Sequence, residues 1–165
     1  MIHPSKIHAT AKKYERENVK FRTFLKCNAD PDELDKQFLA LHNELFSEYD
    51  CCKCGNCCRV YSTVLHMDDM DSISKHLGLA REDFMQKYLV QSVEGYEIKA
   101  PCCFLEEDGK CQIQDCKPEE CRDFPHTDKP GRLGSLLGVL SFAEECPVVF
   151  EILQRLKEMY GFRTR

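Results

Sequence analysis

The sequence predicts a predominantly helical α+β fold: a small, irregular domain whose helices pack around a cysteine-rich centre with short β-hairpins. Three observations predict this class. Apolar residues recur at helical spacing near both ends of the chain. Turn signals separate short β-branched runs in its middle, and twelve of its 165 residues are cysteines. A chain of this length is expected to form one domain, or one domain with helical arms, and to bury a modest core.

Residues 1–50 predict an N-terminal helical pair that packs on the core. In residues 5–26, apolar side chains follow one face of a helix whose outer face is basic. The second helix has clearer start signals, because Asp30 can cap it, Pro31 suits its first position and Glu33 completes a capping box.

Short elements alternate in the middle of the chain. We expect a strand at residues 60–65, followed by two short helices within residues 66–89. Two hairpins are then expected, with turns at Glu94-Gly95 and Asp108-Gly109.

The sequence pattern that begins at Cys146 predicts one more helix near the end of the chain. Cys146 stands where a helix cap belongs, and Pro147 suits the first helical position. We therefore assign residues 51–147 to a cysteine-cluster, metal-binding region and residues 148–165 to a C-terminal helix of the same domain.

Charge is distributed unevenly along the chain, whose net charge is −5. Residues 1–26 carry seven Lys or Arg against two Glu, so the rest of the chain is acidic. Because nucleic acid binds clustered positive charge, we expect no nucleic-acid partner. The basic N-terminal helix leaves a protein partner open, although a solvated helix face is the more common explanation of such a charge run.

The N-terminal residues bear on the cellular compartment in which we expect the protein. They contain no apolar run of signal-peptide length, and no window approaches the ~20 apolar residues of a membrane span. We therefore expect a cytoplasmic protein with no membrane partner. In that reducing compartment, dense cysteines indicate metal more often than disulfides, so we expect a metal-stabilised fold.

The densest cluster is CCKCGNCC at residues 51–58. Cys51, Cys54 and Cys57 form two overlapping CxxC units, a spacing that brings two sulfurs to one metal ion. Neighbouring side chains in an extended segment point apart. Cys57 and Cys58 are therefore expected to serve different ions, or different corners of one cluster.

Further cysteines follow downstream. Cys102 and Cys111 open and close the second expected hairpin, and Cys121 lies in KPEECRDFP. Cys146 lies at a helix N-terminus, where the macrodipole favours the thiolate form that binds metals.

The order of these motifs resembles the YkgJ-like cysteine-cluster family, described as zinc- or iron-chelating. The resemblance rests on CCKCGNCC, CCFLEEDGKCQI, KPEECRDFP and a late Cys-Pro, and it spans about residues 51–147. Two positions depart from the family pattern: Gln114 stands where Tyr is usual, and Lys117 where Arg is usual. The resemblance implies eight metal ligands: Cys51, Cys54, Cys57, Cys58, Cys102, Cys111, Cys121 and Cys146.

The remaining cysteines and one histidine stay open. We expect Cys27 and Cys52 to be bystanders, while Cys103 and Cys116 are further candidates as ligands. Cys103 is also a rival for the place of Cys102. His126 is the best candidate outside the cysteines, but a lone histidine near ligands more often contacts them than binds the metal.

These ligands lead to two functional interpretations. Eight thiolates can make two four-sulfur zinc sites, or they can hold iron–sulfur clusters. We expect zinc, with iron or an iron–sulfur cluster as the alternative, in a metal-binding protein of undetermined cellular role. The second interpretation is an iron–sulfur-dependent redox or protein-modifying enzyme, or its metal-carrying component, because flagellin lysine methylases contain a similar cluster. No phosphate loop, nucleophile elbow or HExxH motif is present, so no catalytic residue is assigned.

Overall fold

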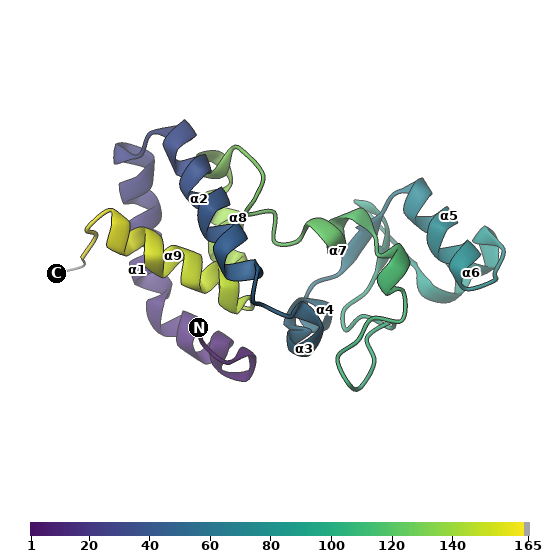
Figure 1. Cartoon of the computed structure of the whole chain (residues 1–165). Helices are drawn as coiled ribbons and strands as arrows, with labels where there is room; N and C mark the ends of the chain where they lie inside the picture. Colours follow the sequence, from purple (N-terminus) through teal and green to yellow (C-terminus); the bar gives the residue numbers. More distant parts are fainter. Residues whose placement is uncertain (164–165) are drawn as a thin grey trace. The chain divides into compact units, whose positions relative to one another are not determined.

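The computed structural model describes residues 1–163 and divides the chain into two compact units. Residues 1–50 and the chain from Pro125 onward form the first, which we call the helical unit. Cys51–Phe124 form the second, which we call the cysteine unit. Helices dominate, and the strands form one small antiparallel sheet (Figure 1). The predicted predominantly helical α+β class is therefore confirmed.

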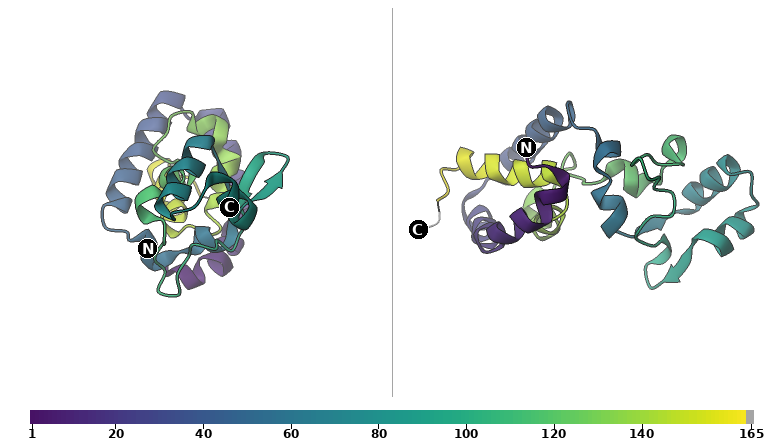
Figure 2. Two further views of the ribbon diagram at one scale, coloured as in Figure 1. Left: turned by 90° about the vertical axis from the view of Figure 1, so that its right-hand side faces the viewer. Right: turned by 90° about the horizontal axis from the view of Figure 1, so that it is seen from below.

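The helical unit is built from four helices that pack against one another (Figures 1 and 2). They follow a short 3₁₀ turn, η1 (Pro4–Lys6), and are α1 (Ile7–Asn28), α2 (Pro31–Phe46), α8 (Arg132–Phe142) and α9 (Pro147–Met159). Their apolar stripes meet in one core, in which Phe21, Phe38 and Ile152 are fully buried. The stripes predicted for the first two helices and for the last therefore face inward.

Local signals set where these helices begin. The Asp30 carboxylate accepts a hydrogen bond from the Glu33 backbone N–H at 3.0 Å, as the capping-box pattern predicts. Cys146 is the residue before α9, and Pro147 opens that helix. Helix α8 was not predicted from the sequence. The backbone N–H groups of Gly131, the residue before the helix, and of Arg132, its first residue, donate to the Asp35 carboxylate at 2.7 and 2.8 Å. This cap comes from a different helix, so no local pattern could reveal it.

The cysteine unit consists of short elements. In chain order they are α3 (Cys51–Cys54), α4 (Asn56–Val60), β1 (Thr63–Leu65), α5 (Met67–His76), α6 (Arg81–Tyr88), β2 (Val90–Ser92), β3 (Gly95–Ile98), η2 (Gln114–Cys116) and α7 (Glu119–Asp123). The sheet has the order β1-β3-β2. In its antiparallel register, Thr63 pairs with Ile98 and Val90 with Glu97.

A small apolar cluster holds the cysteine unit together. Its buried members are Leu65, Met70, Ile73, Phe84, Ile98, Phe104 and Ile113. The second predicted hairpin differs from expectation. Only Leu105 and Cys111 form a β-bridge there, so the segment is a loop closed by one pairing rather than two strands. This segment lies beside the cluster because Phe104 and Ile113 anchor it there.

None of the helices within residues 1–163 combines the length and the apolar character that crossing a bilayer needs.

Candidate metal centre

The CCKCGNCC segment folds as two short helical turns joined at Gly55. Helix α3 ends where the Gly55 N–H donates to the Cys51 carbonyl at 2.9 Å, and Gly55 takes a left-handed conformation with φ of 61°. Glycine adopts this conformation without the steric cost that a Cβ brings. A Cβ there would also lie 2.9 Å from Nη1 of Arg59, which donates to the Cys54 carbonyl at 2.8 Å. The sharp turn between α3 and α4 therefore depends on this glycine.

Cys57 and Cys58 lie next to each other on α4, with their sulfurs 3.9 Å apart. The expectation that these side chains point apart assumed an extended segment, and that premise is wrong because the segment is helical. A hydrogen bond from Cys57 is the main cause that lowers the pKa of Cys58 to about 6, and the charges of Lys117 and Arg59 add to it. Burial of the thiol opposes this shift. Cys58 is thus poised as a thiolate near neutral pH.

Cys102 is tied to Cys58 through the backbone. The Cys102 N–H donates to the Cys58 carbonyl at 2.7 Å. The chain then turns, as the Leu105 N–H donates to the Cys102 carbonyl at 3.2 Å, and Leu105 forms the bridge with Cys111. Both Cys102 and Cys111 pack against the apolar cluster of the unit. The second cysteine group is therefore fixed beside α4.

A glycine allows the loop that carries Cys111 to approach α3. Gly109 has φ of 89°, and a Cβ at this position would lie 2.3 Å from the Cys52 carbonyl oxygen. Any larger residue would force the loop away from α3. The sequence marks Gly109 as a turn residue, but the close approach is a tertiary feature.

Cys121 lies on α7 and faces β1. Its sulfur is 3.4 Å from the hydroxyl of Thr63, the first residue of β1. Helix α7 is held at its start by Asp69, a buried residue of α5 whose carboxylate accepts from the Glu119 N–H at 3.1 Å. The other oxygen of Asp69 accepts from the His66 N–H, also at 3.1 Å. Sequence reasoning missed Asp69 and Thr63, because their partners lie about 50 residues away in the chain.

Burial and mutual repulsion act on the thiols of this unit together. Burial is the main cause that raises the pKa of Cys102 to about 11, and it also raises the pKa of Cys111 and of Cys121. The negative charge of Cys58 raises the pKa of all three further. These three cysteines therefore hold protons at neutral pH unless a cation replaces them.

The cysteines outside the expected ligand set have varied surroundings. Cys27 is exposed at the end of α1, and Cys103 is exposed beside Cys102. The Cys52 thiol donates to the Gln114 side-chain oxygen at 3.7 Å. Cys116, in η2, packs against the apolar cluster, and burial raises its pKa. None of the twelve cysteines, all within the described residues, forms a disulfide.

Cys146 and His126 belong to the helical unit. Cys146 is 9% exposed and precedes the first turn of α9, as its sequence pattern predicts. His126 has φ of 58°, which is uncommon outside glycine, and its carbonyl accepts a hydrogen bond from Arg132. The role of either residue as a ligand stays a prediction.

The donor set fits a soft cation. Thiolate sulfurs suit zinc, iron and iron–sulfur clusters better than magnesium or calcium, which take oxygen ligands. Over residues 1–163, no three Cys, His, Asp or Glu side chains lie in positions that could hold an ion. Coordination would therefore need the thiols of the cysteine unit to turn toward a common point.

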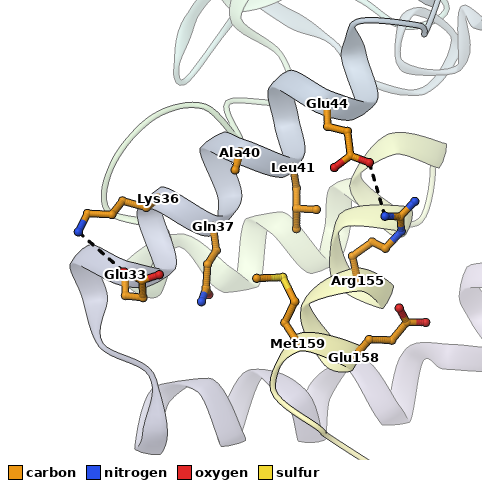
Figure 3. Close-up of a pocket in the computed structure, with 9 residues that line it drawn as sticks. All are labelled: Glu33, Lys36, Gln37, Ala40, Leu41, Glu44, Arg155, Glu158 and Met159. Atoms are coloured by element: carbon orange, nitrogen blue, oxygen red, sulfur yellow. Dashed lines mark ion pairs between the residues drawn. The ribbon is translucent and has the colours of Figure 1, made fainter.

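The helical unit contains a pocket whose lining is apolar and charged rather than cysteine-rich. It lies between α2 and α9, with a volume of about 580 Å³, and Ala40, Leu41 and Met159 form its apolar part (Figure 3). Charged residues surround them, and Glu44 pairs with Arg155 at 3.5 Å. The lining contains no cysteine or histidine, so this pocket offers no ligand for a soft metal.

The family model CxxCxxCC, described as "Putative zinc- or iron-chelating domain", matches residues 50–147. No solved structure matches the chain. The matched region contains all eight expected ligands and covers more than half of the sequence. The chain therefore belongs to the CxxCxxCC family of zinc- or iron-chelating domains.

Proposed function

We propose that this protein binds zinc through the thiolates of its cysteine cluster and that the metal stabilises the fold of the cysteine unit. One observation carries the proposal: seven of the eight expected ligands lie in Cys51–Phe124, a unit of short elements whose apolar core has only seven buried residues. A core of this size stabilises a domain only weakly, and natural domains of this kind often add a metal. Cys146 is the eighth ligand of the proposal.

The residues of the chain supply the conditions for binding. Cys58 is largely deprotonated before a cation arrives, so it can make the first bond. The other buried thiols exchange protons for metal bonds, and Lys117 and Arg59 offset part of the negative charge that collects there. The metal itself supplies a cross-link between segments that share few apolar contacts.

We place this activity in the cytoplasm, because thiolate ligands need a reducing compartment. The basic residues of α1, among them Lys12, Lys13 and Lys20, are solvent-exposed. A protein partner for this face stays a prediction.

Anaerobic purification tests which metal is bound. Elemental analysis should find zinc, without iron or labile sulfide, in a colourless protein. A brown protein with iron, labile sulfide and broad visible absorption would replace this proposal with the iron–sulfur enzyme or its metal-carrying component.

Two substitutions test the ligand set. Cys146→Ser should lower the zinc content per chain, and the exposed Cys27→Ser should leave it unchanged. Equal zinc in the Cys146→Ser variant and the wild type would remove Cys146 from the set. Zinc loss from Cys27→Ser would overturn the assignment as a whole.

A further inference from the structure

The pocket between α2 and α9 is a groove that follows one face of α2. Its lining residues on α2 recur at helical spacing from Glu33 to Glu44, over about three turns. Ala40, Leu41 and Met159 form its apolar middle, and Met159 is 55% exposed (Figure 3). A groove of this form, between two helices and apolar in its middle, suits the face of an amphipathic helix.

The charged groups that line the groove favour a cationic occupant. Both cations of the lining already have carboxylate partners: Lys36 lies 3.8 Å from Glu33, and Arg155 lies 3.5 Å from Glu44. The third carboxylate, of Glu158, acts on Arg155 through its charge but forms no ion pair within residues 1–163. The lining therefore has more negative than positive charge.

Gln37 adds a hydrogen-bond acceptor to the same groove. Its side chain points into the space between α2 and α9 (Figure 3). The amide oxygen is buried and has no hydrogen-bond partner. Leaving a buried acceptor without a donor is unfavourable, so an occupant that carries N–H donors is favoured over an acidic one.

Helix α1 carries an exposed stripe of the complementary character. Lys12, Arg16, Val19, Lys20 and Thr23 are all exposed and follow one face of this helix. Val19 is 51% exposed, so an apolar side chain stands between two cations. None of the three cations of this stripe forms an ion pair within the part of the chain that the structure describes.

The stripe and the groove share one spacing pattern. In each, the apolar part lies at the seventh residue after the first position, and charged residues flank it. Glu33 and Glu44 flank Ala40 in the groove, whereas cations flank Val19 on α1. Among the described residues, none from α1 lines the groove, so the stripe of a chain does not occupy the groove of that chain.

We propose that the exposed α1 stripe of one copy docks in the α2/α9 groove of a second copy, so that the protein self-associates through its helical unit. Arg16 and Lys20 then face the carboxylates of the groove, and Val19 packs on its apolar middle. Both complementary surfaces belong to the same chain, and in a two-fold dimer each copy contributes one of each. This inference goes beyond zinc binding and involves none of the expected ligands.

Sedimentation of the full chain, purified under reducing conditions, tests the association over a range of concentrations. The wild type should associate reversibly. Because salt screens charges across an exposed interface, the dissociation constant should rise at least about tenfold between about 0.05 and about 0.5 M NaCl. A chain that stays monomeric, or an association that salt leaves unchanged, would overturn the proposal.

Charge reversal on either surface should abolish the association. Arg16→Glu/Lys20→Glu reverses the stripe, and Glu44→Lys/Glu158→Lys reverses the rim of the groove; all four side chains are exposed. The control is Lys75→Glu/Lys87→Glu in the cysteine unit, which changes the net charge as much as the stripe variant does and should associate like the wild type. Wild-type association of either reversed variant would contradict the assigned surfaces.

Mixing the two reversed variants tests which surface meets which. In the mixture, the intact stripe of one variant meets the intact groove of the other, and the two reversed surfaces are again of opposite charge. Association should therefore return in the mixture, although each variant alone is monomeric. A mixture that stays monomeric would overturn docking of the stripe in the groove, and a loss of fold in either variant cannot produce the expected rescue.

The apolar contact has its own pair of variants. Val19→Ser removes the apolar side chain from the stripe and should raise the dissociation constant about tenfold. Leu39, which is 43% exposed on α2, does not line the groove, so Leu39→Ser should leave the dissociation constant unchanged. Equal effects of the two substitutions would show that the association uses a different surface.

Discussion

The helical unit and the cysteine unit differ in what fills their interiors. Eighteen of the buried apolar residues in the described chain lie in the helical unit, against seven in the cysteine unit. The cysteines are divided in the opposite way, with ten in the cysteine unit and two in the helical unit. Apolar stripes on long helices bury enough surface to stabilise the first unit. The second unit has short elements and few apolar residues, and we propose that metal-bound thiols stabilise it.

Removing the metal should produce the largest difference in stability between the two units. Structural zinc contributes roughly 10 kcal/mol or more to the folding of small metal-dependent domains. A strong chelator should therefore abolish amide-exchange protection across residues 51–124, measured by hydrogen–deuterium exchange mass spectrometry. Protection in α1, α2, α8 and α9 should persist. Loss of protection in both units would show that the helical core also depends on metal.

The pH dependence of zinc binding tests the charge state of the thiols in the cysteine unit. Burial raises the pKa of Cys102 to about 11 and also raises that of Cys111 and Cys121, so these thiols are protonated at pH 7. The pKa of Cys58 is lowered to about 6, so Cys58 has already lost its proton. Zinc binding to Cys102, Cys111 and Cys121 should therefore release about three protons at pH 7, one from each thiol, and affinity should fall on acidification.

Calorimetry in buffers of different ionisation enthalpy measures this proton release. The Cys102→Ser/Cys111→Ser variant gives the proton release that accompanies zinc binding to the remaining thiols. Release of about four protons by Cys58, Cys102, Cys111 and Cys121 together would mean that Cys58 is protonated like the others.

Substituting one buried phenylalanine in each unit compares the contributions of the two cores to stability and to zinc affinity. Phe38 in α2 is fully buried and Phe104 in the cysteine unit is 1% exposed. Replacing a buried Phe with Ala costs about 3–5 kcal/mol. Phe38→Ala should lower the free energy of unfolding, measured with urea, and leave zinc affinity unchanged. Phe104→Ala should also lower zinc affinity, because this residue anchors the segment between Cys102 and Cys111. Equal zinc affinity in the two variants would contradict the link between this small core and the metal.

Asp69 of α5 holds the start of α7, the helix that carries Cys121, through a hydrogen bond from the Glu119 N–H. In Asp69→Asn, an amide group replaces one of the two oxygens that accept backbone hydrogen bonds. Leaving a buried backbone N–H unpaired costs about 1–3 kcal/mol. The variant should bind zinc about 10–100-fold more weakly, as for other residues that orient metal ligands. Asp68→Asn, an exposed change beside it, is the control and should keep wild-type affinity.

The smallest expected effect concerns His42 in the helical unit. Burial is the main cause that lowers the pKa of His42 below its ordinary value of 6.5, and its ring contacts the Thr127 hydroxyl at 2.8 Å. The unfolded chain therefore takes up a proton at higher pH than the folded chain does. Stability of the helical unit should fall as pH drops below about 6.5.

This pH effect is measured as the exchange protection of α2 between pH 7.5 and pH 5.5, corrected for the intrinsic exchange rate. His42→Gln removes the titrating ring and should flatten the dependence. An unchanged slope in this variant would assign the effect to another group.

The sequence was most informative where local rules act. The capping box at Asp30, the Pro147 start of α9 and the apolar stripe of α2 follow from neighbouring residues, and each is present in the structure. The family resemblance over residues 51–147 was likewise visible in the spacing of the cysteines, and the family match confirms it. Predictions failed where a partner lies far along the chain. Helix α8 is capped by Asp35 of another helix, and a local pattern cannot show such a contact.

The sequence alone determined the class of chemistry: a soft, thiol-rich donor set in a predominantly helical chain. Tertiary structure determined which thiols are neighbours. Cysteine spacing cannot place Cys121 beside Thr63, or the Cys102 backbone beside that of Cys58, because these contacts join segments about 40 to 60 residues apart. They depend on the small apolar cluster and on the hydrogen bonds of Asp69, which connect these segments. Local spacing thus identifies candidate ligands, and long-range packing decides which of them can share an ion.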